Sequence, residues 1–277
     1  MRGSIRSLAF ATAGVIALAT AGGASAANLV TNGGFEDVSS TVTTGSDLGQ
    51  IGSYSSETTT ESSWYLSSQA NSYAWVFEAG ATPCASPCST GGPYDTGPGG
   101  TLALYNDVTA SPNGGDFIGI DPGYPNSGNS NNSSINQSIS GLTVGDQYTV
   151  SFDYAGAQQG PSPGQNGFTG QQTEGWAVSL GGGPAQDTTV LTNCSECFTG
   201  WQTASLTFTA TSTNEVLSFL AIGTGTQPAP AFALLDGVSL TQVTGVPEPA
   251  TWAMMLLGIG GLGGALRMRR KQLFAAA

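Results

Sequence analysis

The chain has 277 residues, of which 18 are Asp or Glu, six are Lys or Arg and none is His. All six basic residues lie near the two ends of the chain. The body from Ala27 to Val246 holds every acid except Glu248, so its net charge is −17. Such a body has no cations to meet phosphates, which argues against nucleic-acid binding, and it lacks His-assisted nucleophiles and Schiff-base lysines.

The first 26 residues are typical of a secretory signal peptide. Arg2 and Arg6 form a basic region, residues 8–19 form an apolar region, and residues 24–26 read Ala-Ser-Ala, a small-residue cleavage site. A buried N-terminal helix is the disfavoured alternative, because no capping residue precedes the apolar run. We therefore expect export, with a mature chain that begins at Ala27.

The body, residues 27–243, shows the two-residue hydrophobic period of β-strands and no helical period. The clearest strand is QYTVSFDYA, residues 147–155, and WQTASLTFTAT, residues 201–211, repeats its alternation. Further strands are expected in GGDFIGI, GWAVSLGG, EVLSFLAIG and AFALLDGVSLTQV. The segments expected to be loops are residues 39–63, 80–100, 122–134 and 156–173. We predict one all-β domain of two packed sheets.

The end of the chain, residues 244–277, combines a proline pair, an apolar run and a basic cluster. Residues 252–266 would form a helix of about 22 Å, short of a hydrocarbon core of roughly 30 Å, so spanning requires membrane thinning or snorkelling. The basic cluster after this run would stay cytoplasmic, which leaves the body outside the inner membrane. The sequence thus predicts a marginal transmembrane helix.

The residues of this tail closely resemble the PEP-CTERM sorting signal of Gram-negative bacteria, in its Pro-Glu-Pro-x-x-Trp-Ala variant. The residues that carry the resemblance are Pro247, Glu248, Pro249, Trp252, Ala253, Arg267, Arg269 and Arg270. The resemblance implies processing by an exosortase, a membrane protease of exopolysaccharide-producing bacteria. It also implies only a transient stay of residues 252–266 in the inner membrane. We expect a final location at the cell surface, in the outer envelope or in the extracellular matrix.

Three motifs of the body carry a second resemblance. NLVTNGGFE stands at the mature start, Trp201 precedes an alternating strand, and LLDGVSL lies in the closing strand. In this order they resemble the secreted jelly rolls of the galactose-binding-like superfamily, which includes many carbohydrate-binding modules. The resemblance implies a two-sheet jelly-roll sandwich that binds polysaccharide without catalysis, although a likeness of fold does not transfer a ligand.

The acids of the body predict cation binding. Carboxylates without basic partners must, where buried, accept hydrogen bonds, take up protons or bind metal, and oxygen ligands favour Ca²⁺. Related jelly-roll modules often hold a structural calcium between their first and last strands, and the resemblance places Glu36 and Asp236 at those positions. The alternative is that both carboxylates bond only to turn amides.

Aromatic side chains in loop-like surroundings are the candidates for stacking on sugar rings. They are Trp64, Tyr94 and Tyr124, whereas Trp201 and the other large aromatics fit the core better. A carboxylate pair of the glycosidase type is a remote alternative, drawn from Glu57, Glu61, Glu78, Asp153 and Glu174. A solvated acidic surface explains those acids more simply, so we assign no catalytic residue and expect a non-enzyme.

Four cysteines occur as Cys84-x3-Cys88 and Cys194-x2-Cys197. In an exported chain the ordinary interpretation is two disulfides, with three possible connectivities, of which local pairing is weakly favoured. A four-thiolate zinc site is the alternative. Two functions remain open, a polysaccharide-binding surface protein and a structural biofilm-matrix protein or adhesin with no specific glycan ligand.

Overall fold

The computed structural model describes residues 26–40, 51–54, 57–67, 73–77, 94–95, 102–105, 108–122, 134–160, 168–225, 231–243 and 249–274. The strands within them are β1 (Val38–Ser40), β2 (Gly52–Tyr54), β3 (Glu57–Glu61), β4 (Tyr65–Leu66), β5 (Ala74–Phe77), β6 (Tyr94–Asp95), β7 (Leu102–Ala103), β8 (Phe117–Ile120), β9 (Ser134–Ser140), β10 (Gln147–Gln158), β11 (Gln172–Leu180), β12 (Gln186–Asp187), β13 (Leu191–Asn193), β14 (Gln202–Thr209), β15 (Asn214–Gly225) and β16 (Ala231–Gln242). One helix, α1 (Pro249–Phe274), follows them. Residues 1–25 of the expected signal peptide lie outside the described residues.

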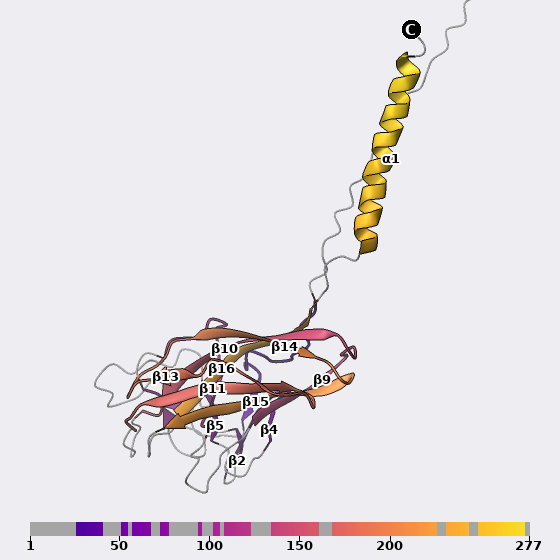
Figure 1. Cartoon of the computed structure of the whole chain (residues 1–277). Coiled ribbons are helices and arrows are strands. Elements are labelled where there is room, and N and C mark those ends of the chain that lie inside the picture. The colour runs from indigo at the N-terminus through magenta and orange to yellow at the C-terminus, as the bar shows by residue number, and fades with distance from the viewer. Residues whose placement is uncertain are drawn as a thin grey trace, which may run out of the picture.

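The major strands form two antiparallel sheets packed as a sandwich (Figure 1). The first sheet has the order β14-β10-β16-β8-β5 and the second has the order β12-β11-β15-β9-β4, with β13 also paired to β11. From β8 to β11, and again from β14 to β16, successive strands alternate between the two sheets. This alternation confirms the predicted all-β, two-sheet jelly-roll architecture.

The core lies between the sheets and is built from the inward face of each strand. In β10 the predicted alternation is confirmed, because Tyr148, Val150, Phe152 and Tyr154 are all buried. The facing sheet contributes Trp176, which is fully buried and whose Nε1 donates to the carbonyl oxygen of Leu234 at 3.0 Å. The two layers are therefore joined by a hydrogen bond as well as by apolar packing.

A second apolar cluster lies at the β5 end of the first sheet. Its buried aromatics are Trp75, Phe77, Phe117 and Phe232. Trp201 packs edge-on against Phe117, with ring centroids 5.4 Å apart, and its Nε1 donates to the carbonyl oxygen of Thr109 at 2.9 Å. The prediction that Trp201 serves packing is thereby confirmed.

Part of the segment predicted to be loop is instead a small sheet. Strands β1, β3 and β2 pair antiparallel in that order, with Val38 opposite Glu61. The expectation of a loop over residues 39–63 is therefore wrong for the described part. The reason is that threonine is β-branched and fits a pleated surface, even in a sequence without apolar alternation.

Helix α1 is longer than the apolar run that predicted it. Pro249 is at its first position, where a missing amide hydrogen costs nothing, and the helix continues through the basic cluster because Leu, Met, Arg and Lys favour helix. Figure 1 shows α1 apart from the sandwich. Within the described chain, no helix is both long enough and apolar enough to cross a membrane. The transmembrane helix expected from the sequence is therefore not found in this part of the chain.

Candidate functional site

Residues 28–33, near the start of the described chain, are hydrogen-bonded to β16, the last strand of the sandwich. Asn28 Oδ1 accepts from the backbone amide of Leu240 at 2.9 Å, and the amide of Leu29 donates to the Leu240 carbonyl oxygen. Further along, the amide of Val238 donates to the Gly33 carbonyl oxygen at 2.8 Å. A Cβ on Gly33 would lie 1.9 Å from the Val238 carbonyl oxygen, so this close approach requires glycine.

The turn in NLVTNGGFE is fixed by Asn32, which has a φ of 50°. Its Nδ2 donates to the carbonyl oxygens of Asp37 and Ser62 and to Glu61 Oε2, and its Oδ1 accepts from the Asp37 amide at 3.1 Å. Phe35, also at positive φ, is fully buried in the core. Anchored on both sides, the turn holds Glu36 in a defined place.

A second Asn-Gly-Gly turn, residues 113–115, packs against the first. Glu36 Oε1 accepts from the backbone amide of Asp116 at 2.9 Å. An added Cβ on Gly115 would lie 1.5 Å from Glu36 Oε1, and one on Gly34 would lie 2.6 Å from Asn113 Nδ2. Gly115 therefore leaves the space for the Glu36 carboxylate, and Gly34 leaves the space for the Asn113 side chain.

Asp236 approaches the same place from β16. It is fully buried, and its Oδ1 accepts from the Gly237 amide at 2.6 Å and from Asn113 Nδ2 at 3.5 Å. Its other oxygen, Oδ2, has no hydrogen-bond partner in the structure. Glu36 and Asp236 are 200 residues apart in sequence, and both lie beside the turn at residues 113–115.

Carboxylates in this region raise one another's pKa. Burial, together with the charges of Glu36 and Asp153, raises the pKa of Asp236 to about 7. Burial and the charge of Asp116 raise the pKa of Glu36. Burial also raises the pKa of Glu61 to about 8, with further contributions from Asp116 and Glu36. A bound cation or a proton would relieve this repulsion.

The sequence prediction missed three contributors to this site, Asn113, Gly115 and Asp116. The available signal was the repeated Asn-Gly-Gly followed by an acid, at residues 32–36 and 113–116. Nothing local in the sequence says that the two turns meet.

The three aromatic residues proposed to stack on sugar rings lie in different parts of the chain. Trp64 is buried, its ring centroid lies 5.3 Å from that of Phe35, and its Nε1 donates to the Asn32 carbonyl oxygen at 2.9 Å. Trp64 is therefore a core residue that packs beneath the Asn32 turn, and it is not exposed for stacking on a sugar ring. Tyr94 begins β6, and Tyr124 lies outside the described residues.

The candidate carboxylates for a glycosidase pair are separated by the fold. Glu61 belongs to the Glu36 region, and Asp153 lies opposite Asp236 and accepts from Thr203 Oγ1 at 2.7 Å. Glu174 is fully buried between the sheets. Glu57 begins β3, and Glu78 lies outside the described residues. None of these acids lines the pocket described next.

An open pocket of about 570 Å³ lies at one end of the second sheet. Its walls are Ser138, Ile139, Ser140, Gly181, Gly182, Thr211, Ser212, Asn214, Glu215 and Val216. Glu215 Oε1 accepts from Thr211 Oγ1 and from the amides of Thr211 and Ser212, so it fixes the turn that forms one wall. The polar lining is mostly neutral hydroxyl and amide groups.

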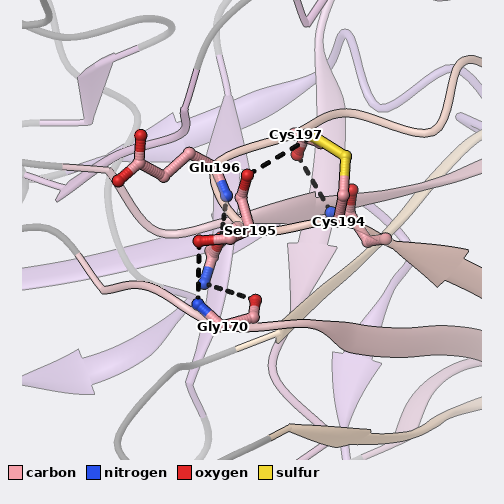
Figure 2. Close-up of a disulfide and its surroundings, with 7 residues drawn as sticks. Gly170, Cys194, Ser195, Glu196 and Cys197 are labelled. Carbon is pink, nitrogen blue, oxygen red and sulfur yellow. Dashed lines mark hydrogen bonds between the residues drawn. A yellow bond between two sulfur atoms is a disulfide. The ribbon is translucent and has the colours of Figure 1, made fainter.

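Cys194 and Cys197 form a disulfide, as the local pairing predicts (Figure 2). This bond excludes both cross-pairing and a zinc site for these two cysteines. Cys84 and Cys88 lie outside the described residues. The loop is tied down by neighbours, since Ser195 Oγ accepts from the Gly170 amide at 2.9 Å.

Residues 245–271 match the family model of the PEP-CTERM protein-sorting motif. The chain carries this sorting motif, and it is therefore an exported protein. Trp252 and Ala253 lie in the first turns of α1, and Arg267, Arg269 and Arg270 lie near its end. Pro247 and Glu248 lie just outside the described residues.

No match is found among curated proteins. Among solved structures, the carbohydrate-binding module TmCBM61, solved with β-1,4-galactotriose, is 14% identical, with 78% of this chain and 99% of that chain covered and a TM-score of 0.37. A cyclase from Fischerella sp. TAU is 14% identical, with 80% and 100% covered and a TM-score of 0.46. A CBM4 module is 17% identical, with 77% and 99% covered and a TM-score of 0.31. At these levels neither a ligand nor a reaction transfers to this chain.

Proposed function

We propose that this exported protein is processed by an exosortase, is displayed at the cell surface or in the extracellular matrix, and binds polysaccharide without altering it. The observation that carries the proposal is the open pocket whose walls hold Ser138, Ser140, Ser212 and Asn214. Hydroxyl and amide groups both donate and accept, which is what a ring of sugar hydroxyls requires. The pocket's volume is within the range of small-ligand sites.

The ligand class we propose is a neutral glycan. From Ala27 to Val246 the chain has no Lys, Arg or His, so no side chain there can pair with a uronate, sulfate or phosphate. The net charge of −17 repels such polymers at long range, and added salt only screens that repulsion.

Affinity electrophoresis in gels that contain a neutral or an anionic polysaccharide tests the ligand class. We expect retardation by a neutral glycan and none by an anionic one at low salt. Gly182→Leu should abolish the retardation, because Gly182 lines the pocket and a Cβ there meets nothing within 4 Å, so the larger side chain fills the pocket without a clash. Ser205→Leu on the exposed face of β14 is the matched control and should bind normally. Retardation that survives Gly182→Leu would reject the pocket.

We further propose that Ca²⁺ binds between Glu36 and Asp236 and has a structural role. What supports such an ion is the buried Asp236 Oδ2, which has no hydrogen-bond partner, and the nearby charges of Glu36 and Asp153, which raise the pKa of Asp236. No three Asp, Glu, His or Cys side chains of the described residues are grouped so as to hold a metal. The ion would therefore take neutral oxygens, such as main-chain carbonyls, in addition to the two carboxylates.

A structural matrix protein or adhesin is the second candidate. It is favoured by the charge of the body, which keeps the protein soluble at high concentration. In that case no glycan would retard the protein in any gel, and deletion of the gene would change the mechanics of the matrix.

A further inference from the structure

Glu174 is an acid placed in the core, on the inward face of β11 together with Gln172 and Trp176. Its exposed fraction is 0%, and neither of its carboxylate oxygens has a hydrogen-bond partner in the structure. In the facing sheet, a Cβ on Gly156 of β10 would lie 2.5 Å from Glu174 Oε2. Only glycine leaves room for the carboxyl group, so the fold has a built place for it.

Asn193 lies beside Glu174, since β13 pairs with β11 so that Asn193 is opposite Gln172 and Leu191 is opposite Glu174. The exposed fraction of Asn193 is 1%, its Nδ2 donates to the Cys197 carbonyl oxygen at 3.0 Å, and its Oδ1 has no partner. If the Asn193 side-chain amide were rotated by half a turn, its Oδ1 would face the Cys197 carbonyl oxygen. Two acceptors cannot form a hydrogen bond, so the orientation with Nδ2 toward Cys197 is fixed. Three buried acceptor atoms on two neighbouring side chains thus lack a donor.

The loop that Asn193 holds is the disulfide loop, residues 194–197. Besides the Asn193 bond, the Glu196 amide donates to Gln158 Oε1 at 2.6 Å, and Ser195 Oγ accepts from the Gly170 amide (Figure 2). The Thr199 amide donates to the Gly156 carbonyl oxygen at 3.0 Å, directly beside the Glu174 carboxyl group. The loop therefore covers the place where Glu174 is buried.

We propose that Glu174 is the proton-bearing residue of a latch that fastens the disulfide loop to the sandwich. As a carboxylic acid it has a hydrogen to donate toward the Asn193 amide oxygen, and an ionised carboxylate has none. Without the proton, a charge with no basic partner is left in the core. Opening of the loop is then the route by which water reaches that charge.

The direction of the pH effect follows from the environment of Glu174. Burial is the dominant cause, and it raises the pKa of Glu174 to about 8. Titratable side chains on the elements packed against β11 are Tyr148, Asp153 and Tyr154 of β10, Asp236 of β16, Asp187 of β12 and Glu215 of β15, and the disulfide loop adds Glu196. None of these groups contributes to the shift of the Glu174 pKa. In an opened loop the pKa of Glu174 would return to its ordinary value near 4.5. The free energy that favours the closed loop therefore decreases as the pH rises from about 4.5 to about 8.

Hydrogen exchange at the Cys197 and Thr199 amides tests the latch in the full sandwich. After correction for the intrinsic exchange rate, opening of the wild-type loop should rise roughly tenfold per pH unit from about pH 5 and become level above about pH 8. Glu174→Gln keeps a donor and an acceptor without the charge, so its loop should open equally at every pH. Glu61→Gln, a buried acid elsewhere in the fold, should behave like the wild type.

A wild-type loop whose corrected opening does not change with pH would overturn the proposal. So would a Glu174→Gln loop that keeps the wild-type pH dependence. If Glu174→Gln fails to fold, the carboxyl carbon of Glu174 in the wild type can be titrated by NMR. A midpoint at the ordinary value of a glutamate would then reject the latch, and a midpoint well above it would support the latch.

Discussion

At the scale of single residues, glycine and asparagine do most of the positioning. Gly33 lets its segment of the chain approach the last strand, and Gly115 leaves the space that the Glu36 carboxylate occupies. The sequence resemblance pointed to Glu36 and Asp236, which both lie beside the turn at residues 113–115. It could not identify Asn113, because that turn reaches the site only through tertiary packing. Glu174 was assigned to the surface, although its spacing of two from Trp176 already placed it on the buried face.

The calcium proposal makes a prediction at this scale. Calcium at a hundredfold excess over Kd should stabilise the fold by about 2.7 kcal/mol, which corresponds to a rise in Tm of roughly 5–10 °C for a domain of this size. Asp236→Asn should remove the response to calcium and to EDTA, because it replaces the unpartnered carboxylate oxygen with a neutral amide. Thermal melts of both proteins measure this effect. Asp187→Asn, an exposed acid on β12, should respond as the wild type does. An unchanged wild-type midpoint across these conditions would remove calcium from the proposal.

At the scale of elements, long alternating strands were predictable and short ones were not. β10 and β14 follow from their period of two, since packing on one face is encoded locally. The strands β1 to β3 have no apolar alternation and become strands by pairing with one another. Helix α1 continues past its apolar run because helix propensity does not depend on hydrophobicity.

The disulfide should stabilise this part of the fold modestly. Replacing both Cys194 and Cys197 with serine should lower the free energy of unfolding by about 2 kcal/mol, the chain-entropy estimate for so short a loop. Urea denaturation of the double variant and the wild type measures the difference. Ser195→Ala keeps the disulfide and loses only the hydroxyl that accepts from Gly170, so it separates the two effects. Equal stability of the double variant and the wild type would contradict the prediction.

At the scale of the whole molecule, the acidic body and the sorting motif occupy separate parts of the chain. The body has only acids, the tail has only bases after Glu248, and the sorting motif covers the junction and the helix. This division was visible in the sequence, because targeting signals are linear and need no folding to be recognised. The pocket was not predictable, since its walls come from three separate segments of the chain.

Removal of residues 247–277 tests the role of the tail. The truncated protein should fold, because α1 lies outside the sandwich, and it should appear in the periplasm or the medium without surface retention. Cell fractionation of the two proteins measures the distribution, with a variant that changes only Trp252→Ala as a narrower lesion of the motif. Mass spectrometry of the protein at the cell surface should also show that the C-terminal end of the precursor has been removed. Intact Arg267 to Ala277 on that protein would contradict processing.

The pairing of Asn28 with Thr241 means that the chain enters and leaves the sandwich at the same corner. Gln242 Nε2 donates to Asp146 Oδ2 there, and the amide of Ala210, which leads into the pocket wall, donates to the Asp146 carbonyl oxygen. A reporter fused directly before Asn28 would therefore lie beside the end of β16, from which the chain leads on to the sorting motif.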